Sequence, residues 1–193
     1  KLTSKIKITM KSLVISDIHD NIKNLESALQ LATTASCDSI ICCGDLCSPF
    51  ILNQIHQKYK LPVHIVFGNN DGDKFHLIQK AVFLNTDRNQ GCKITLHGEF
   101  LIAEKGHKLD GISSSVAIAV YHYPQMAEII ARSGIFDYVF YGHTHKSSIE
   151  TKGTCLLANP GSVMGFIPSN AETVAASCLI VNFETKELEL LEL

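Results

Sequence analysis

The sequence predicts an α/β protein with a parallel sheet in its first half and a more mixed set of strands in its second half. Two observations support this prediction. Up to about residue 71, short apolar runs alternate with amphipathic helical segments, and this alternation is typical of parallel sheets. Hydrophobic residues make up 46% and charged residues 19% of the 193 residues, which favours a folded core over disorder. The length fits one domain, so residues 1–193 are expected to form a single domain.

The first half contains three predicted strands and two predicted helices. The strands are expected within residues 12–16, 38–46 and 62–71, and the helices within residues 24–32 and 48–59. In the first helix the apolar residues recur at i, i+3, i+4 and i+7, which marks one buried face. Asn21 or Asn24 is available near its start. For the second helix, Ser48 is the expected N-cap and Pro49 the first helical residue.

The second half is dominated by strands. Residues 93–106 are predicted to form two short strands around His97 and Gly98, in a hairpin. Further strands are expected within residues 116–124, 137–145, 155–162, 177–184 and 188–193. One helix is expected at residues 125–134, with Gly134 just past its end.

Composition excludes several classes of function. A net charge of −2 does not suggest nucleic-acid binding, and the apolar runs are too short to cross a bilayer. The odd number of cysteines, without a CxxC pair, is interpreted as reduced thiols in a cytoplasmic protein. A zinc site on Cys43 and Cys47 lacks a second pair of ligands. Residues 1–10 are interpreted as an N-terminal extension, native or not, in which Ile6 and Ile8 alternate as in a short strand.

Polar side chains of the kind that bind metals follow five of the predicted strands. They are Asp17, His19, Asp45, Asn69, His122, His143 and His145. Because the carboxyl ends of parallel strands meet at one edge of a sheet, we expect these side chains to gather there. In Asp-x-His and His-x-His on extended backbone, alternate side chains point to one face. The preceding glycines are expected to allow sharp turns.

The chemistry of these side chains is that of ligands for divalent metals. Imidazole, carboxylate and amide oxygen suit Mn, Fe, Zn, Ni or Co. Seven ligands are too many for one such ion, but they suffice for two ions that share a bridging carboxylate. Taken alone, Asp-x-His and Gly-Asp are weak signals, since Gly-Asp after a strand is often only a turn, whereas GNND and GHTH are more specific. Their order, each at a strand end, carries the prediction.

The same motifs resemble those of the calcineurin-like metallophosphoesterase family. They are DIHDN (17–21), CGDL (43–46), FGNND (67–71), YHYP (121–124) and YGHTH (141–145). NPGS (159–162), which follows them in the chain, is also similar to a segment of the family. The match covers Leu13 to about Ser162 and looks closest to the small prokaryotic phosphodiesterase branch. The resemblance implies a four-layer α/β/β/α sandwich, in which two mixed sheets are flanked by helices.

The resemblance also implies a division of the ligands between two divalent ions. Asp17, His19 and His145 would hold the first ion, Asn69, His122 and His143 the second, and Asp45 would bridge them. Manganese is expected, with nickel, iron or zinc as alternatives. The implied activity is two-metal-dependent hydrolysis of a phosphate ester, in which a metal-bridging hydroxide attacks phosphorus in line without a covalent enzyme intermediate.

Two departures from the family pattern affect the expected substrate. Asn70 stands where relatives have His or Cys, and asparagine can donate a hydrogen bond but cannot act as a general acid. Leaving groups that need no protonation are therefore favoured. Asn70 and Asp71 are the expected catalytic residues, and Asp71 is expected to act by orienting the turn. Asp20 adds a carboxylate beside the site and would repel dianionic monoesters, so a small phosphodiester is favoured.

Asn21, Asn70 and Tyr123 are the expected substrate-binding residues. Asn21 would donate to a phosphate oxygen, or would only cap the first helix. Tyr123 would line the pocket, or would only pack. His107 is interpreted as a surface histidine rather than a proton donor. The other histidines, His56, His64, His76 and His97, are assigned no function.

Two alternative functions stay open. One is a phosphomonoesterase with the same mechanism, and the other is a non-catalytic scaffold of the same fold that binds proteins. The complete set of seven ligand positions favours catalysis. A large exposed apolar patch would favour the scaffold. The expected partner is a small phosphate ester, not nucleic acid or a membrane, and pairing of two chains through an exposed sheet edge is left open.

Overall fold

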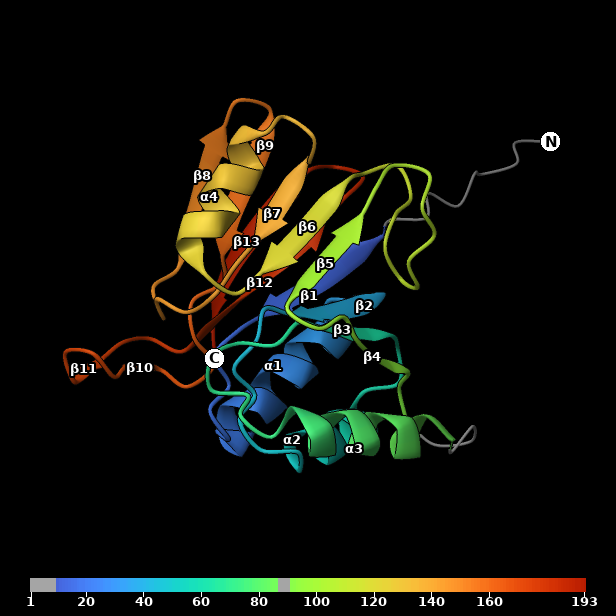
Figure 1. Ribbon diagram of the computed structural model, residues 1–193, viewed down its shortest axis with the longest axis vertical. Coiled ribbons are helices and arrows are strands. Elements are labelled where there is room, and N and C mark those ends of the chain that lie inside the picture. Colours follow the sequence, from blue (N-terminus) through green and yellow to red (C-terminus); the bar gives the residue numbers. More distant parts are fainter. Residues whose placement is uncertain (1–9, 87–90) are drawn as a thin grey trace.

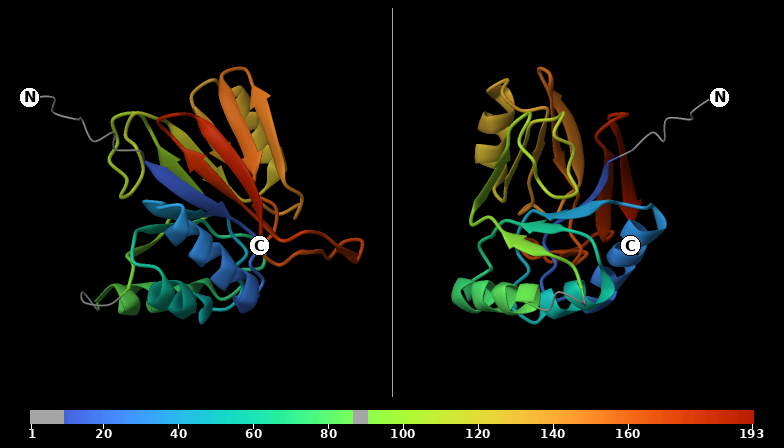
Figure 2. Two further views of the ribbon diagram at one scale, coloured as in Figure 1. Left: turned by 180° about the vertical axis from the view of Figure 1, so that it is seen from behind. Right: turned by 90° about the vertical axis from the view of Figure 1, so that its right-hand side faces the viewer.

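The computed structural model describes residues 10–86 and 91–193, which form four layers of secondary structure (Figure 1). The helices are α1 (Ile22–Thr34), α2 (Ile51–Lys58), α3 (Lys74–Thr86) and α4 (Pro124–Arg132). Helices α1 to α3 cover one sheet, and α4 covers the outer face of the other (Figure 2, right). The predicted α/β/β/α sandwich of two mixed sheets is confirmed.

The first sheet is six-stranded, in the order β13-β12-β1-β2-β3-β4. Its strands are β1 (Lys11–Ile15), β2 (Ser39–Cys42), β3 (Val63–Ile65), β4 (Ile94–Leu96), β12 (Ser177–Asn182) and β13 (Glu187–Glu192). Strands β1 to β4 are parallel, whereas β12 and β13 run antiparallel to their neighbours. The expected parallel sheet of the first half is therefore extended by two C-terminal strands.

The second sheet is five-stranded, in the order β5-β6-β7-β9-β8. Its strands are β5 (Phe100–Ala103), β6 (Ile118–Tyr121), β7 (Tyr138–Phe140), β8 (Ser148–Lys152) and β9 (Cys155–Asn159). Strands β6, β7 and β9 are parallel, and the two edge strands are antiparallel. A separate two-stranded ribbon, β10 (Phe166–Ile167) and β11 (Glu172–Thr173), projects from the body of the protein (Figure 1).

Strands that are buried on both faces explain the continuous apolar runs in the sequence. In β1, Leu13 and Ile15 pack toward the helices, whereas Val14 packs between the two sheets. Phe140 of β7 and Leu179 of β12 join the cluster between the sheets. The carboxyl ends of parallel strands in both sheets are thereby held by a rigid core.

Three local predictions need correction. The strands around His97 do not form a hairpin, because β4 pairs with β3 in one sheet and β5 pairs with β6 in the other. Helix α2 begins at Ile51 rather than near Ser48, whose hydroxyl and backbone N–H both bind the Asp20 carboxylate. Helix α3 was not predicted at all. Gly134 does follow the end of α4 in a left-handed conformation, with φ of 73°.

No helix among residues 10–86 and 91–193 combines the length and the apolarity needed to span a membrane. The short strand considered at Ile6 and Ile8 lies outside the described residues.

Candidate metal centre

The structure brings the seven predicted metal-binding side chains together at one place. They come from the loops that follow β1, β2 and β3 of the first sheet and β6 and β7 of the second sheet. The cluster therefore lies where the carboxyl ends of parallel strands from both sheets meet, as expected for ligand sites in α/β proteins.

The first predicted set centres on Asp17, which is fully buried. Its Oδ1 lies 3.3 Å from His145 Nε2 and 3.9 Å from His19 Nε2. His19 Nε2 in turn lies 3.5 Å from Asp45 Oδ2. Ligand atoms that share one ion at about 2.1 Å are themselves about 3.0–3.4 Å apart, so these spacings need little adjustment.

The second predicted set surrounds the side chain of Asn69. Asn69 Oδ1 lies 3.0 Å from His122 Nε2 and 2.8 Å from His143 Nδ1. His122 Nε2 also lies 3.5 Å from Asp45 Oδ2. That carboxylate oxygen is thus equidistant from a histidine of each set, which is the position that a bridging ligand requires.

Two observations indicate that these residues fit divalent cations. Asp17 Oδ1 and His19 Nε2 are buried and have no hydrogen-bond partner, which is costly unless another ligand is bound. Among the described residues, two groups of carboxylate and imidazole ligands lie close enough to hold an ion: Asp17, His19 and His145, and Asp17, Asp45 and His122. Both groups have the mixture of oxygen and nitrogen donors that first-row divalent metals prefer.

The histidine rings are held by partners behind the cluster. His122 Nδ1 donates to the carbonyl of Cys43 at 2.8 Å, and His145 Nδ1 donates to the carbonyl of Phe166. A metal-binding histidine commonly makes such a bond with the ring nitrogen that faces away from the metal. His19 differs, because its Nδ1 lies 3.4 Å from the thiol sulfur of Cys47.

The backbone at the site is not extended, contrary to the expectation for Asp-x-His and His-x-His. Asp17, His19, Asp45, His143 and His145 all have positive φ, between 43° and 68°. Such values are uncommon for residues other than glycine and are concentrated at functional sites. The side chains therefore converge because the loops turn, not because strand residues alternate.

The glycines next to the ligands act partly through close packing. At Gly68 and Gly142, φ is not in the left-handed region. A Cβ atom added to Gly68 would collide with Asp45 Oδ1, and one added to Gly142 would collide with Ser16 Oγ. Only Gly44, with φ of 106°, needs the conformational freedom that was expected of all three.

Asp71 is buried and holds the loops in place. Its Oδ2 accepts from the backbone N–H groups of Asp45 and Gly68, and its Oδ1 accepts from that of Cys47. Burial raises the pKa of Asp71 in spite of these hydrogen bonds. Asp71 thus orients the loop as predicted; a direct catalytic role for it stays a prediction.

The carboxylates and histidines shift one another's pKa values. Burial acts to raise the pKa of Asp45, but hydrogen bonds from His122 and Asn70 outweigh it and lower that pKa to about 2. Burial lowers the pKa of His19 and of His143. It acts in the same direction on His122, where the Asp45 carboxylate outweighs it and raises the pKa. An ionised Asp45 is ready to bind a cation.

A cavity of about 460 Å³ opens onto the cluster. It is lined by His19, Asp45, Asn69, Asn70, His143, Thr144, His145, Lys146, Ile167, Pro168, Ser169 and Asn170. The last four residues belong to the ribbon formed by β10 and β11 or to its turn. No motif or periodicity in the sequence predicts that this ribbon, or Lys146, lies beside the site.

The predicted substrate-binding residues lie in different environments. Asn70 lines the cavity, and the Tyr123 ring packs 5.1 Å from the rings of His122 and His143, at the edge of the cluster. Asn21 caps α1 by accepting from Asn24 N–H, and its amide donates to the Met164 carbonyl. Its alternative role as a helix cap is confirmed, and contact with substrate stays a prediction for all three residues.

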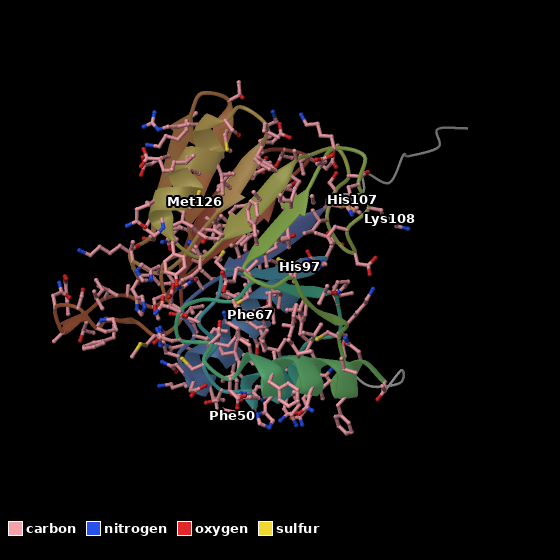
Figure 3. All side chains as sticks on the ribbon, viewed as in Figure 1. Phe50, Phe67, His97, His107, Lys108 and Met126 are labelled. Atoms are coloured by element: carbon pink, nitrogen blue, oxygen red, sulfur yellow. The ribbon has the colours of Figure 1, made fainter. Side chains whose placement is uncertain are left out.

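The positions of His107 and of the cysteines Cys43 and Cys47 decide two further expectations. His107 is exposed on the loop after β5, on the opposite side of the protein from the β10–β11 ribbon (Figure 3). It is a surface histidine, as interpreted. Neither Cys43 nor Cys47 belongs to a metal-binding group within the described chain, and Cys43 packs between the sheets. The zinc site considered for these two cysteines is therefore not formed.

The NPGS segment forms hydrogen bonds with the loops that carry the predicted metal ligands. Asn159 Nδ2 donates to the Gly142 carbonyl and to Thr144 Oγ1, within the loop that carries both histidines after β7. Ser162 Oγ donates to the backbone carbonyl of Asp17. Through these bonds the segment fixes the loops that carry Asp17, His143 and His145.

Comparison with known proteins agrees with this arrangement. The sequence profile of the calcineurin-like phosphoesterase superfamily domain matches residues 10–186. Phosphodiesterase MJ0936 from Methanocaldococcus jannaschii is 26% identical over 158 residues, which cover 82% of this chain and 87% of that protein. A solved structure described as a novel archaeal phosphodiesterase superposes with a TM-score of 0.78 at 24% identity, covering 95% of this chain and all of that one.

Related folds also occur among proteins with other names. Vps29 from Entamoeba histolytica, solved with Zn²⁺, superposes with a TM-score of 0.62 at 19% identity, over 94% of this chain and 90% of that chain. At this identity the likeness shows the fold alone. The match over residues 10–186, with the cluster of carboxylates and imidazoles, shows that the chain belongs to the calcineurin-like phosphoesterase superfamily and is a metal-dependent phosphoesterase.

Proposed function

We propose that this chain, acting as a single domain, hydrolyses a small phosphodiester with the help of two divalent cations, manganese by preference. The observation that carries the proposal is the position of Asp45 Oδ2, 3.5 Å from His19 Nε2 and 3.5 Å from His122 Nε2. A shared carboxylate between two sets of ligands is what a two-ion site needs. When bound, two cations attract the ester oxygens and lower the pKa of the attacking water.

The residues of the chain have separable roles in this proposal. Asp17, His19 and His145 would hold one cation, Asn69, His122 and His143 would hold the other, and Asp45 would be shared by the two sets. Asp71 keeps the loops of Asp45 and Asn70 together through its backbone hydrogen bonds. The cavity beside the cluster would receive the organic part of the ester between Lys146 and the β10–β11 ribbon.

The preference for a diester rests on Asn70 and on the archaeal relative named a phosphodiesterase. Asn70 cannot protonate a leaving group. Asp20 does not contribute to this preference, because both of its carboxylate oxygens accept hydrogen bonds from Ser48 and it is not among the residues that line the cavity. A monoesterase with the same mechanism is the alternative.

The seven thiols are all free, which supports the proposed cytoplasmic location.

The scaffold alternative predicted a large exposed apolar patch, and α3 carries one. That patch lies on the outer surface of the helix layer, and the set of ligands at the metal centre is complete. The two features are therefore compatible with an enzyme that also has an interaction surface.

The test is hydrolysis of bis-p-nitrophenyl phosphate and of p-nitrophenyl phosphate by metal-stripped protein, with Mn²⁺ added back. We expect turnover of the diester only with Mn²⁺, slower turnover of the monoester, and loss of both in Asp45→Asn. Faster turnover of the monoester would favour the alternative. No metal-dependent turnover of either ester would refute the proposal.

A further inference from the structure

Helix α3 is apolar on two opposite faces. Leu77, Ala81 and Leu84 are buried against the first sheet and its helices. On the outer face, Phe75 is 66% exposed, Ile78 47%, Val82 60% and Phe83 68%. With about 100° of rotation per residue, these four side chains fall within an arc of about 140°. The outer face of a surface helix is normally polar, whereas within this arc Gln79 is flanked by four exposed apolar side chains.

We propose that this outer face of α3, defined by Phe75, Ile78, Val82 and Phe83, joins two copies of the chain in an isologous dimer. In such a dimer the same patch of both copies meets itself across a twofold axis, so the two α3 helices cross each other in opposite directions. The proposal concerns a surface other than the metal centre and does not depend on the proposed function.

The apolar area is sufficient for such a contact. Phenylalanine side chains bury about 150–250 Å² each, so the four exposed fractions amount to roughly 450 Å² per copy. Phe50, at 42% exposure, lies on the outer side of the same helix layer and adds to this area (Figure 3). Two copies would remove about 1,000 Å² of apolar surface from water, which is the lower range for a specific interface.

The shape of the surface is suited to contact with itself. A hollow of about 500 Å³ between α3 and the start of α2 is lined by Pro49, Asp73, His76, Gln79, Lys80 and Phe83. Phe83 lines this hollow and also belongs to the outer face, so the hollow adjoins the exposed apolar side chains. In the proposed dimer, outer-face side chains of one copy would lie against the hollow of the other.

Charge also favours a second copy. Asp73 immediately precedes α3, and Lys80 lies two helical turns further along the same flank. Asp73 pairs with His76 Nδ1 at 2.8 Å in its own chain, but this pair is exposed, and an antiparallel crossing brings it toward Lys80 of the other copy. Lys80 Nζ lies over the Phe83 ring at 5.8 Å and makes no ion pair within residues 10–86 and 91–193. A membrane surface fits less well, because Lys58 and Lys74 near this layer are paired with Glu26 and Glu99, which leaves Lys60 and Lys80 as the nearby lysines without an ion pair among the described residues.

The edge strand β13 is a poorer place for pairing than the outer face of α3. Edge strand β13 exposes Glu187, Glu189 and Glu192. Antiparallel pairing of two such strands would bring carboxylates close together, and charged edge strands generally resist association.

The test is sedimentation velocity of the full chain from about 1 to 200 µM, with a matched set of variants. We expect the weight-average mass to rise toward twice that of the chain, with a Kd on the order of 10 µM. Val82→Glu and the milder Val82→Ser should weaken the dimer at least tenfold. Ile129→Glu, at a 64% exposed residue of α4, should leave it unchanged.

A single-chain mass at every concentration would overturn the proposal. So would a dimer that is insensitive to both Val82 variants, or one that Ile129→Glu weakens equally. Circular dichroism of each variant shows that the fold is intact, as expected because all the substituted side chains are exposed.

Discussion

Asn70 makes two hydrogen bonds to one carboxylate, that of Asp45. Its backbone N–H donates to Oδ1 at 2.7 Å, and its side-chain Nδ2 donates to Oδ2 at 2.8 Å. The same Oδ2 faces His19 and His122. Asn70 therefore positions the group that would bridge the two cations, whereas the sequence suggested only a donor to the substrate.

Removing this amide should loosen Asp45. In Asn70→Ala the backbone bond remains but Oδ2 loses its donor, so we expect metal affinity and kcat to fall by about 10–100-fold, as for other groups that orient metal ligands. Calorimetric titration with Mn²⁺ and diesterase kinetics measure the two effects. Asn170→Ala is the matched control for the Mn²⁺ affinity alone, because Asn170 lines the same cavity but bonds Glu172 rather than Asp45. Equal affinities for wild type and Asn70→Ala would contradict the assigned role.

Cys47 should orient His19 through the contact between its sulfur and Nδ1. Cys47→Ala removes this partner, and we expect Mn²⁺ to bind the His19 side about tenfold more weakly. Cys47→Ser keeps an acceptor and should restore most of the affinity. If calorimetry shows that alanine and serine behave alike, the contact does not position the ring.

Asp71 should stabilise the fold as well as the site. In Asp71→Asn an NH₂ group replaces one of the oxygens that accept backbone N–H groups, and a buried donor then faces a donor. We expect a loss of about 2–3 kcal/mol in the free energy of unfolding. Asp73→Asn changes an exposed carboxylate two residues away and should cost much less. Urea denaturation of the metal-free proteins gives both values, and similar losses would contradict this account.

Stability should fall in mild acid because of a buried histidine pair. His64 Nδ1 lies 3.1 Å from His97 Nε2, and His64 Nε2 donates to the Asp110 carbonyl. Burial, and then the neighbouring His64, lower the pKa of His97 to about 4. Unfolded histidine titrates near 6.5, so between these values the unfolded chain binds a proton that the folded chain does not. The stability gained from neutral His97 is present above about pH 6.5 and is lost as the pH falls toward 4.

The measurement is the free energy of unfolding at about pH 7 and about pH 5, for wild type and His97→Gln. Glutamine can still donate to His64 but does not titrate. Because His97 is only half-buried, we expect the wild type to lose about 1–2 kcal/mol more than the variant over this interval. Parallel losses in both proteins would show that His97 is not the group responsible.

The features that sequence predicted well are those set by local pattern and topology. Apolar runs that end in Asp, Asn or His marked the strands, and parallel pairing collected the side chains that follow them. The helix cap at Asn21 and the glycine after α4, Gly134, can be predicted from sequence because both roles depend on residues nearby in the chain. The division of strands between two sheets came from the family resemblance, not from periodicity.

The features that sequence missed depend on contacts distant along the chain. Helix α3 was overlooked because Phe75, Ile78, Val82 and Phe83 fill the face that would be polar in an ordinary surface helix. The two strands around His97 looked like a hairpin because sequence does not reveal that each has a nearer partner in a different sheet.

The backbone of the metal centre was also beyond local prediction. Asp and His adopt positive φ more readily than most other residues. At this site, however, the conformation is stabilised by hydrogen bonds between loops. Asp71 and the NPGS segment supply such bonds from other parts of the chain.

Calorimetric titration of metal-stripped protein with Mn²⁺ counts the ions bound per chain and so distinguishes one cation site from two. We expect two ions for the wild type, one for His19→Ala and one for His122→Ala, with the diesterase activity lost in both variants. Binding of a single ion by the wild type, or two ions in either variant, would contradict a site divided between two sets of ligands.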